Sequence, residues 1–298
     1  MRLNQKIFLL FLMGLLFSAC RSAPVPAPSP TVSPLPQETV SAVPTDPAPT
    51  ATPEALAVTV NGEGIALAEY QAELLRYQDA AKVDTLTPED GQRVLDELIN
   101  QTLLAQAAAE NGLTPTAEAV DQRLTALESA RGTQAFEQWL QRNHYTRATF
   151  RSALARSLAA AAMRDQIQAQ IPAEIEQTHA RQIAHYDSVT MQQVETLLKQ
   201  GSDFDTLAAQ YDPFTLGELG WFPPGYLLQP ELESAIAALQ PGETSAIIQT
   251  EIGYHIVRVL AREPHPLTAA AAEFVQQQTL TQWLQTRRAQ SKITLMLP

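Results

Sequence analysis

Apolar residues between positions 56 and 171 recur mostly three and four positions apart, the spacing of amphipathic helices. Val58 and Val60 alternate before the turn signal Asn61-Gly62, which predicts a short strand, and a helix follows from Ile65. Further helices are expected over 88–112, 115–131, 133–145 and 146–167. An apolar stripe on a helix needs a partner. The first folded part is therefore expected to be a set of packed helices.

Residues 178–262 change to a shorter period, in which strands alternate with short helices. Strands are expected over 179–184, 218–222, 244–250 and 253–259, and helices over 190–200, from 203, and over 231–239. In the last strand, "GYHIVRV", His255 shares a face with Val257 and Val259, and the opposite face is also apolar. Such a strand should be covered on both sides. From this strand alone, His255 is either a hydrogen-bonded core residue or part of a site.

Residues 264–298 return to helical spacing and end in "KITLML", whose alternation predicts a short strand. An amphipathic helix is not stable alone in water. We therefore expect 264–297, with Trp283, to pack against the helices of 66–171, and the final strand to pair near 56–60.

The N-terminus has the pattern of an export signal. Arg2 and Lys6 precede the apolar run Ile7–Phe17, which is too short to span a bilayer. Cys20, the only cysteine, follows two small residues and resembles the bacterial lipoprotein box, in which the cysteine is lipidated. An ordinary signal peptide is the alternative. Residues 21–53 hold 10 of the 21 prolines and predict a solvated tether, with a proline-rich ligand as the rival reading.

The net charge and the cysteine count limit which partners and cross-links are expected. A formal charge of −12 disfavours nucleic acid and anionic lipid headgroups, so membrane attachment should occur through acyl chains. One cysteine permits no internal disulfide. We find no metal-ligand spacing or phosphate loop and expect neither metal nor cofactor. A metal pair of His179 and His185 is the one arrangement to test.

Four linked motifs in 178–262 resemble the parvulin family of peptidyl-prolyl cis-trans isomerases: "FDTLAAQY", "GELGWF", "LQPGETSAIIQT" and "GYHIVRV". The surrounding helices, "VNGEGI" and the closing helix look like the discontinuous chaperone domain of SurA- and PrsA-type extracytoplasmic foldases. The expected fold is mainly α with an inserted α+β domain, a four-stranded antiparallel sheet flanked by helices. The expected segments are a signal peptide (1–19), a lipidated tether (20–53), a helical domain (54–174), a parvulin-like domain (175–263) and a helix that completes the helical domain (264–298).

The resemblance implies a catalytic site and a pocket for the proline ring. His255, Thr250 and Gly253 fall on positions that the family uses beside the amide. The residues implied for the pocket and its rim are Leu219, Phe222, Leu227 or Leu228, and Leu232.

Two departures occur at this site. Gln182 stands where the family has a second histidine, and the loop 212–216, "DPFTL", is shorter than usual. Asp212 is the nearest counterpart of the family's cysteine or aspartate, although aspartate before proline also forms turns. This loop has no basic residue, which does not support phosphoserine specificity.

The expected function is a lipid-anchored, extracytoplasmic isomerase of proline-containing secreted or cell-envelope polypeptides, with activity reduced by Gln182. The alternatives are a non-catalytic chaperone or peptide-binding module that uses the same pocket, and a structural surface lipoprotein.

Overall fold

The computed structural model describes residues 55–297, which fall into two compact units. The first comprises 55–103, 115–157 and 291–297, and the second 104–114 and 158–290. Cys20 and the predicted signal peptide and tether lie outside the described residues.

The first unit contains a three-stranded antiparallel sheet of order β2-β1-β7. Its strands are β1 (Leu56–Val60), β2 (Glu63–Ala66) and β7 (Ile293–Leu295). Val58 of β1 lies opposite Leu295 of β7, so the predicted return of the C-terminal strand to residues 56–60 is confirmed. The side chain of Asn61 also accepts a hydrogen bond from the backbone N–H of Lys292 at 2.9 Å.

Five helices follow β2 along the chain. They are α2 (Leu67–Ala81), α3 (Pro88–Glu110), α4 (Ala117–Arg131), α5 (Thr133–Arg142) and α6 (Arg147–Ala169). Pro88 is the first residue of α3, as expected. α4 begins at Ala117, two residues later than expected, and the Thr116 side chain caps it. Val58 and Val60 are fully buried among Val94, Leu98 and other residues of α3.

In the second unit, α10 (Ala269–Ala289) packs on the C-terminal parts of α3 and α6. Trp283, Leu280 and Leu284 contact a cluster that includes Ala107 and Met163. The expected packing of Trp283 on helices from the N-terminal half is confirmed. None of the described helices is long and apolar enough to cross a membrane.

A second sheet, antiparallel and of order β4-β3-β6-β5, forms the rest of this unit. Its strands are β3 (Glu174–His185), β4 (Glu218–Phe222), β5 (Ile248–Thr250) and β6 (Gly253–Pro266). The two central strands are longer than predicted because residues 174–179 and 261–266 pair with each other. β5 is shorter than predicted, and Thr244 makes only an isolated bridge to Arg258.

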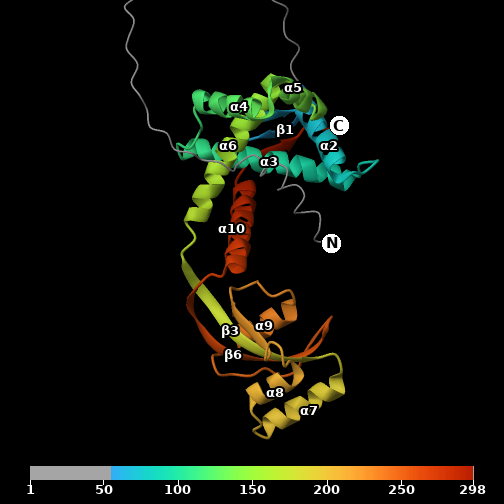
Figure 1. Ribbon diagram of the computed structural model, residues 1–298, viewed down its shortest axis with the longest axis vertical. Helices are drawn as coiled ribbons and strands as arrows, with labels where there is room; N and C mark the ends of the chain where they lie inside the picture. The colour runs from blue at the N-terminus through green and yellow to red at the C-terminus, as the bar shows by residue number, and fades with distance from the viewer. Residues whose placement is uncertain (1–54, 298) are drawn as a thin grey trace, which may run out of the picture. The chain divides into compact units, whose positions relative to one another are not determined.

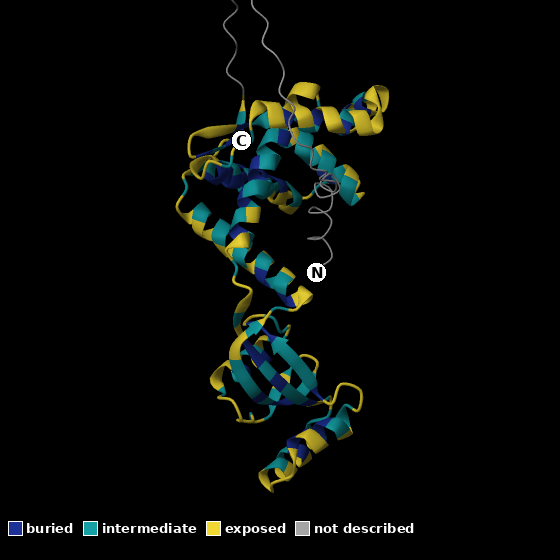
Figure 2. Cartoon of the chain, turned by 60° about the vertical axis from the view of Figure 1, so that its left-hand side comes forward, coloured by how far each residue is buried: buried dark blue, intermediate teal, exposed yellow. Residues whose placement is uncertain are grey.

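Helices cover both faces of this sheet, as the apolar pattern of β6 requires (Figure 1). α7 (Ser188–Lys199) and α8 (Phe204–Tyr211) pack on the face that carries Ile183 and Ile256. α9 (Pro230–Ala238) packs on the opposite face, with Val257 and Val259. Buried residues therefore run along the central strands (Figure 2).

Candidate functional site

His255 lies on the α9 face of the sheet, one pair from the end of the ladder between β3 and β6. In this register His255 lies opposite Ala184, and Gln182 lies opposite Val257. Gln182 and His255 are therefore diagonal neighbours on one face, close enough for side-chain contact. Their side chains meet: Gln182 Oε1 is 3.0 Å from His255 Nδ1.

The second ring nitrogen of His255 contacts Thr250. His255 Nε2 lies 3.0 Å from Thr250 Oγ1, which also accepts a hydrogen bond from the backbone N–H of Ile252 at 3.2 Å. Because an amide oxygen only accepts, the contact with Gln182 places the proton on Nδ1. Nε2 is then the acceptor for the Thr250 hydroxyl. These two contacts hold the His255 ring in one orientation.

The imidazole is shielded from water. His255 is 3% exposed, and its burial lowers its pKa below the ordinary value of 6.5. The neutral ring is therefore the form present at neutral pH. It can act as a fixed hydrogen-bonding dipole rather than as a cation.

An apolar cluster lies on the same face of the sheet as His255. Four of the residues predicted for the proline pocket belong to it: Leu219, Phe222, Leu227 and Leu232. Val257, on the same face of β6 as His255, is also a member. Leu228, given as the alternative to Leu227, is 67% exposed and lies outside the cluster. The structure therefore favours Leu227 at this position.

The side chain of Asp212 stabilises the turn that follows α8. It follows α8, and its carboxylate accepts hydrogen bonds from the backbone N–H groups of Phe214 (3.2 Å) and Thr215 (3.1 Å) and from the Thr215 hydroxyl. These hydrogen bonds, chiefly those from Thr215, lower the pKa of Asp212. The hydrogen bonds of His255 run to Gln182 and Thr250 instead. These contacts support a turn-forming role for Asp212. None of them connects its carboxylate to His255, so they do not support a catalytic role.

Two glycines permit close approaches of backbone at this site. A Cβ on Gly217 would lie 2.1 Å from the carbonyl oxygen of Gln182, whose N–H donates to Gly217 O at 2.8 Å. A Cβ on Gly253 would lie 2.8 Å from the carbonyl oxygen of His185, and its φ of +137° is itself unfavourable for other residues. Gly253 therefore shapes the turn into β6 that places His255.

His179 and His185 are too far apart to share a metal ion. They are six residues apart on β3, which corresponds to about 20 Å. His179 pairs with Glu218 at 2.5 Å, whereas His185 Nδ1 accepts the backbone N–H of Asp187 at 3.0 Å. The arrangement considered from the sequence is wrong. Among the described residues, no group of three or more His, Cys, Asp or Glu side chains is placed to hold a metal.

Sequence reasoning missed two supports of the apolar cluster. The Glu233 carboxylate accepts the backbone N–H of Leu227 at 2.7 Å and so fixes that residue. Tyr226 packs edge-on against Phe274 of α10, with ring centroids 5.4 Å apart. Residues 223–229, "PPGYLLQ", have no period that indicates these contacts.

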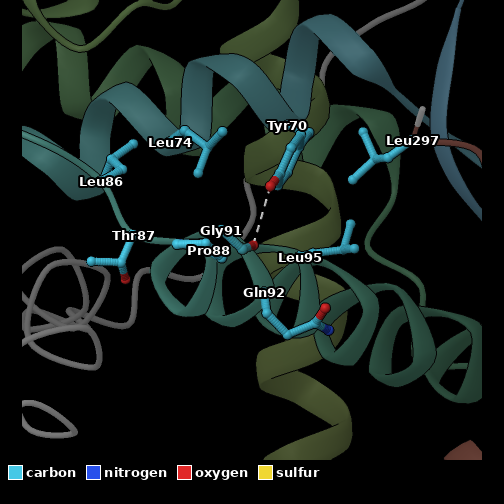
Figure 3. Close-up of a pocket in the computed structure, with 9 residues that line it drawn as sticks. All are labelled: Tyr70, Leu74, Leu86, Thr87, Pro88, Gly91, Gln92, Leu95 and Leu297. Atoms are coloured by element: carbon cyan, nitrogen blue, oxygen red, sulfur yellow. Dashed lines mark hydrogen bonds between the residues drawn. The ribbon is translucent and has the colours of Figure 1, made fainter.

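The first unit has an apolar hollow of its own, with a volume of about 410 Å³ (Figure 3). Tyr70 points from α2 toward α3 and donates a hydrogen bond to the carbonyl oxygen of Gly91 at 3.2 Å. Leu74, Leu95 and Leu297 line it, so it is formed by both ends of the described chain. It has no counterpart among the residues predicted from the sequence.

Known proteins resemble both parts of the chain. The SurA-like N-terminal domain family matches residues 45–164, and the PPIC-type PPIASE domain family matches residues 159–261. Foldase protein PrsA of Geobacillus sp. (strain WCH70) is 33% identical over 116 residues, covering 37% of this chain and 42% of the relative. Chaperone SurA of Bordetella avium (strain 197N) is 32% identical over 148 residues, covering 42% of this chain and 29% of the relative.

This chain thus spans less than half the length of both curated relatives. The crystal structure of the peptidylprolyl isomerase PrsA from Bacillus cereus is 21% identical, with a TM-score of 0.41, over 79% of this chain and 86% of that one. The two family matches overlap over residues 159–164, within α6. Residues 45–164 are therefore a SurA-like N-terminal domain, and residues 159–261 are a PPIC-type PPIase domain.

Proposed function

We propose that the chain is a peptidyl-prolyl cis-trans isomerase that assists the folding of secreted or cell-envelope polypeptides. The observation that supports this most directly is the position of His255. It is buried, held on both ring nitrogens, and lies on the same sheet face as an apolar cluster of leucines and Phe222. Leu219 and Leu227 of this cluster are partly exposed, and apolar side chains beside a fixed dipole suit a proline ring and its preceding amide.

The reaction needs no bond to be made or broken. Rotation about an X–Pro bond crosses a barrier of roughly 18–20 kcal/mol because the planar amide loses its resonance. A site lowers this barrier by binding the twisted amide better than the planar one. In this proposal Leu219, Leu227 and Leu232 contact the ring, and the His255 network supplies the dipoles. No proton has to move.

A second candidate function is a module that binds proline-containing segments without accelerating rotation. One observation favours it: Gln182 and Thr250 already occupy both ring nitrogens of His255. A substrate amide would have to share or displace one of these hydrogen bonds. We therefore expect lower isomerase activity than a site with two histidines would give. A module that binds proline-containing segments without accelerating rotation is the limiting case of this reduction.

The deciding experiment is cis-trans exchange measured by NMR on an Ala-Pro peptide, together with peptide affinity. The whole chain and its His255→Ala variant are compared, with melting temperature as the control for folding. Exchange that the wild type accelerates and the variant does not supports the isomerase. Binding without acceleration supports the module. Neither binding nor acceleration would refute both proposals.

We further propose that the protein acts outside the cytoplasm and is held to a bacterial membrane by lipid on Cys20. The export pattern of residues 2–20 supports this, and the chain resembles relatives named PrsA and SurA. Clients would be unfolded or extended chains. For such clients the hollow beside Tyr70 offers apolar contact in the first unit.

A further inference from the structure

The hollow beside Tyr70 lies between α2 and α3 of the first unit, with Leu86 and Leu297 at opposite ends (Figure 3). None of the nine residues that line it carries a charge. Its wall consists largely of leucine side chains, the Tyr70 ring and Pro88. Pockets of this composition bind ligands that are themselves mostly apolar. A ligand for the hollow should therefore be apolar or neutral along its length.

The described part of the chain begins beside this hollow. The backbone N–H of Leu67, the first residue of α2, donates to the carbonyl oxygen of Ala55 at 2.7 Å, and Tyr70 follows about one helical turn later. The backbone N–H of Met296 donates to the carbonyl oxygen of Ala57 at 2.9 Å, and the next residue after Met296 lines the hollow. The chain before Ala55 therefore joins the folded unit close to two side chains of the hollow's wall.

A neutral, proline-rich segment directly precedes this point. Residues 47–53, "PAPTATP", end two positions before Ala55 and contain three prolines and no charged residue. We call them the proline segment. Segments of this composition favour polyproline II, whose limited conformational freedom lets them bind apolar grooves with aromatic walls at a low entropic cost. The proline segment thus has the chemistry that the hollow requires.

The dimensions of the proline segment and the hollow also agree. At about 1.5 Å per helical residue, the wall of α3 from Pro88 to Leu95 is about 10 Å long. At about 3.1 Å per residue in polyproline II, about three or four residues cover that length. Covalent attachment through a short linker raises the effective concentration of a ligand to the millimolar range. Even a weak contact is therefore sufficient for the segment to occupy the hollow.

We propose that the proline segment docks in the hollow beside Tyr70 of its own chain, where an apolar segment of a client must displace it. The docking itself is independent of isomerase activity. Its consequence for clients rests on the proposed function, in which unfolded clients contact this hollow. The proline-rich region then acts as an intramolecular competitor as well as a spacer.

The test measures whether the proline segment lies in the hollow of the whole chain. A nitroxide is attached at Thr50→Cys in a Cys20→Ser background, so that the chain has a single thiol. Broadening of leucine methyl signals by the nitroxide reports which side chains lie near it. The test variant removes the three prolines of the segment: Pro47→Ser, Pro49→Ser and Pro53→Ser. The matched control removes three prolines farther from the folded unit: Pro26→Ser, Pro28→Ser and Pro30→Ser.

The expected result is broadening of the methyl signals of Leu74, Leu86 and Leu297. The test variant should lose this broadening, and the matched control should keep it. Broadening that is absent, or that the test variant keeps, overturns the docking, because a tether that only passes near its exit point does not depend on these prolines.

Client competition is measured with a fluorescent peptide of alternating leucine and serine, which contains no proline. The test variant should bind this peptide about three- to tenfold more tightly than the wild type and the matched control, because the tethered competitor is weakened. The same leucine methyl signals should shift when the peptide binds. Equal affinity in all three chains would assign the hollow to clients alone and overturn the competitor.

The competitor and the isomerase fail in distinguishable ways. Exchange of an Ala-Pro peptide reports on the His255 site and should be equal in the test variant and the matched control. Exchange that is accelerated while the hollow shows no broadening retains the isomerase and overturns the competitor, and the opposite result reverses this. Mixing nitroxide-bearing chains with isotope-labelled chains that carry no nitroxide gives the last outcome. Broadening in the isotope-labelled chains would show docking on a second copy and overturn the intramolecular contact.

Discussion

Gln182 is the residue at which the hydrogen bonding of the site can be tested most directly. Replacing it with leucine removes the acceptor of the His255 Nδ1 proton while keeping a side chain of similar size. Because His255 is 3% exposed, water has little access to replace that acceptor. The ring must either keep an unpaired Nδ1–H or move its proton to Nε2 and donate to Thr250.

Both outcomes cost free energy. A buried donor or acceptor without a partner costs about 1–3 kcal/mol. If the proton moves, Nε2–H donates to Thr250 Oγ1, whose own hydroxyl can turn to the Gly253 carbonyl oxygen, 3.2 Å away. Nδ1 is unpaired in both outcomes, but in the second the Thr250 hydroxyl gains an additional hydrogen bond to Gly253, so the second outcome costs less. We expect Gln182→Leu to lower the free energy of unfolding by about 1–2 kcal/mol and to reverse the tautomer.

Nitrogen-15 NMR of the ring and urea unfolding at pH 7.5 measure these two effects. The wild type should show a protonated Nδ1, and Gln182→Leu a protonated Nε2. The matched variant Gln182→Glu keeps an acceptor and adds a negative charge, so the Nδ1 proton should stay and the pKa of His255 should rise. An unchanged tautomer in Gln182→Leu, with a stability loss below about 0.3 kcal/mol, would refute the reasoning.

Four further outcomes are expected. Gln182→His should raise the exchange rate of an Ala-Pro peptide, because a second imidazole faces the amide, and an unchanged or lower rate counts against a catalytic role for position 182. Leu232→Ala should lower the free energy of unfolding by about 2–5 kcal/mol and weaken proline-peptide binding in the fraction that remains folded, whereas unchanged affinity removes Leu232 from the pocket. Burial lowers the pKa of His255, so below about pH 6.5 the unfolded chain binds a proton that the folded chain does not. As the pH is lowered below about 6.5, urea titrations should therefore show the free energy of unfolding decreasing more steeply in the wild type than in His255→Leu. The difference in slope should be up to about 1.4 kcal/mol per pH unit, and equal slopes would contradict this. Cys20→Ser should release the protein from membranes or leave an uncleaved precursor, and a processed variant that stays membrane-bound in high salt argues against lipidation.

The fold was predictable wherever one side of an element had to be apolar. The helices of the first unit and the core of β6 follow from spacing alone, because burial fixes which positions must be apolar. The outer ends of β3 and β6 could not be predicted in this way. Residues 174–177, "EIEQ", and 263–266, "EPHP", are polar or proline-rich, and they are strands because they pair with each other. Pairing between segments almost ninety positions apart leaves no mark on local periodicity.

The site was predictable to a different degree at each residue. His255 and Thr250 followed from the motif, but their contact with Gln182 depends on the register of β3 against β6. At Asp212 the same residue type suits a turn and a catalytic acid, so only its hydrogen bonds favour one role. Leu227 and Leu228 lie in an irregular segment where neither period applies. There the hydrogen bond from the Leu227 N–H to the Glu233 carboxylate distinguishes Leu227 from Leu228.

The glutamine at position 182 is compatible with a reaction that moves no proton. A site of this kind needs a group that holds His255 in place, and an amide oxygen does so by accepting one hydrogen bond, as a neutral imidazole nitrogen would. The difference lies in adaptability. An imidazole changes between donor and acceptor with its tautomer and gains a proton near neutral pH, whereas a glutamine oxygen accepts at every pH. With its oxygen toward Nδ1, Gln182 favours the Nδ1 tautomer of His255 and a constant orientation of the ring, and it offers less adjustment to the twisted amide than a second imidazole would.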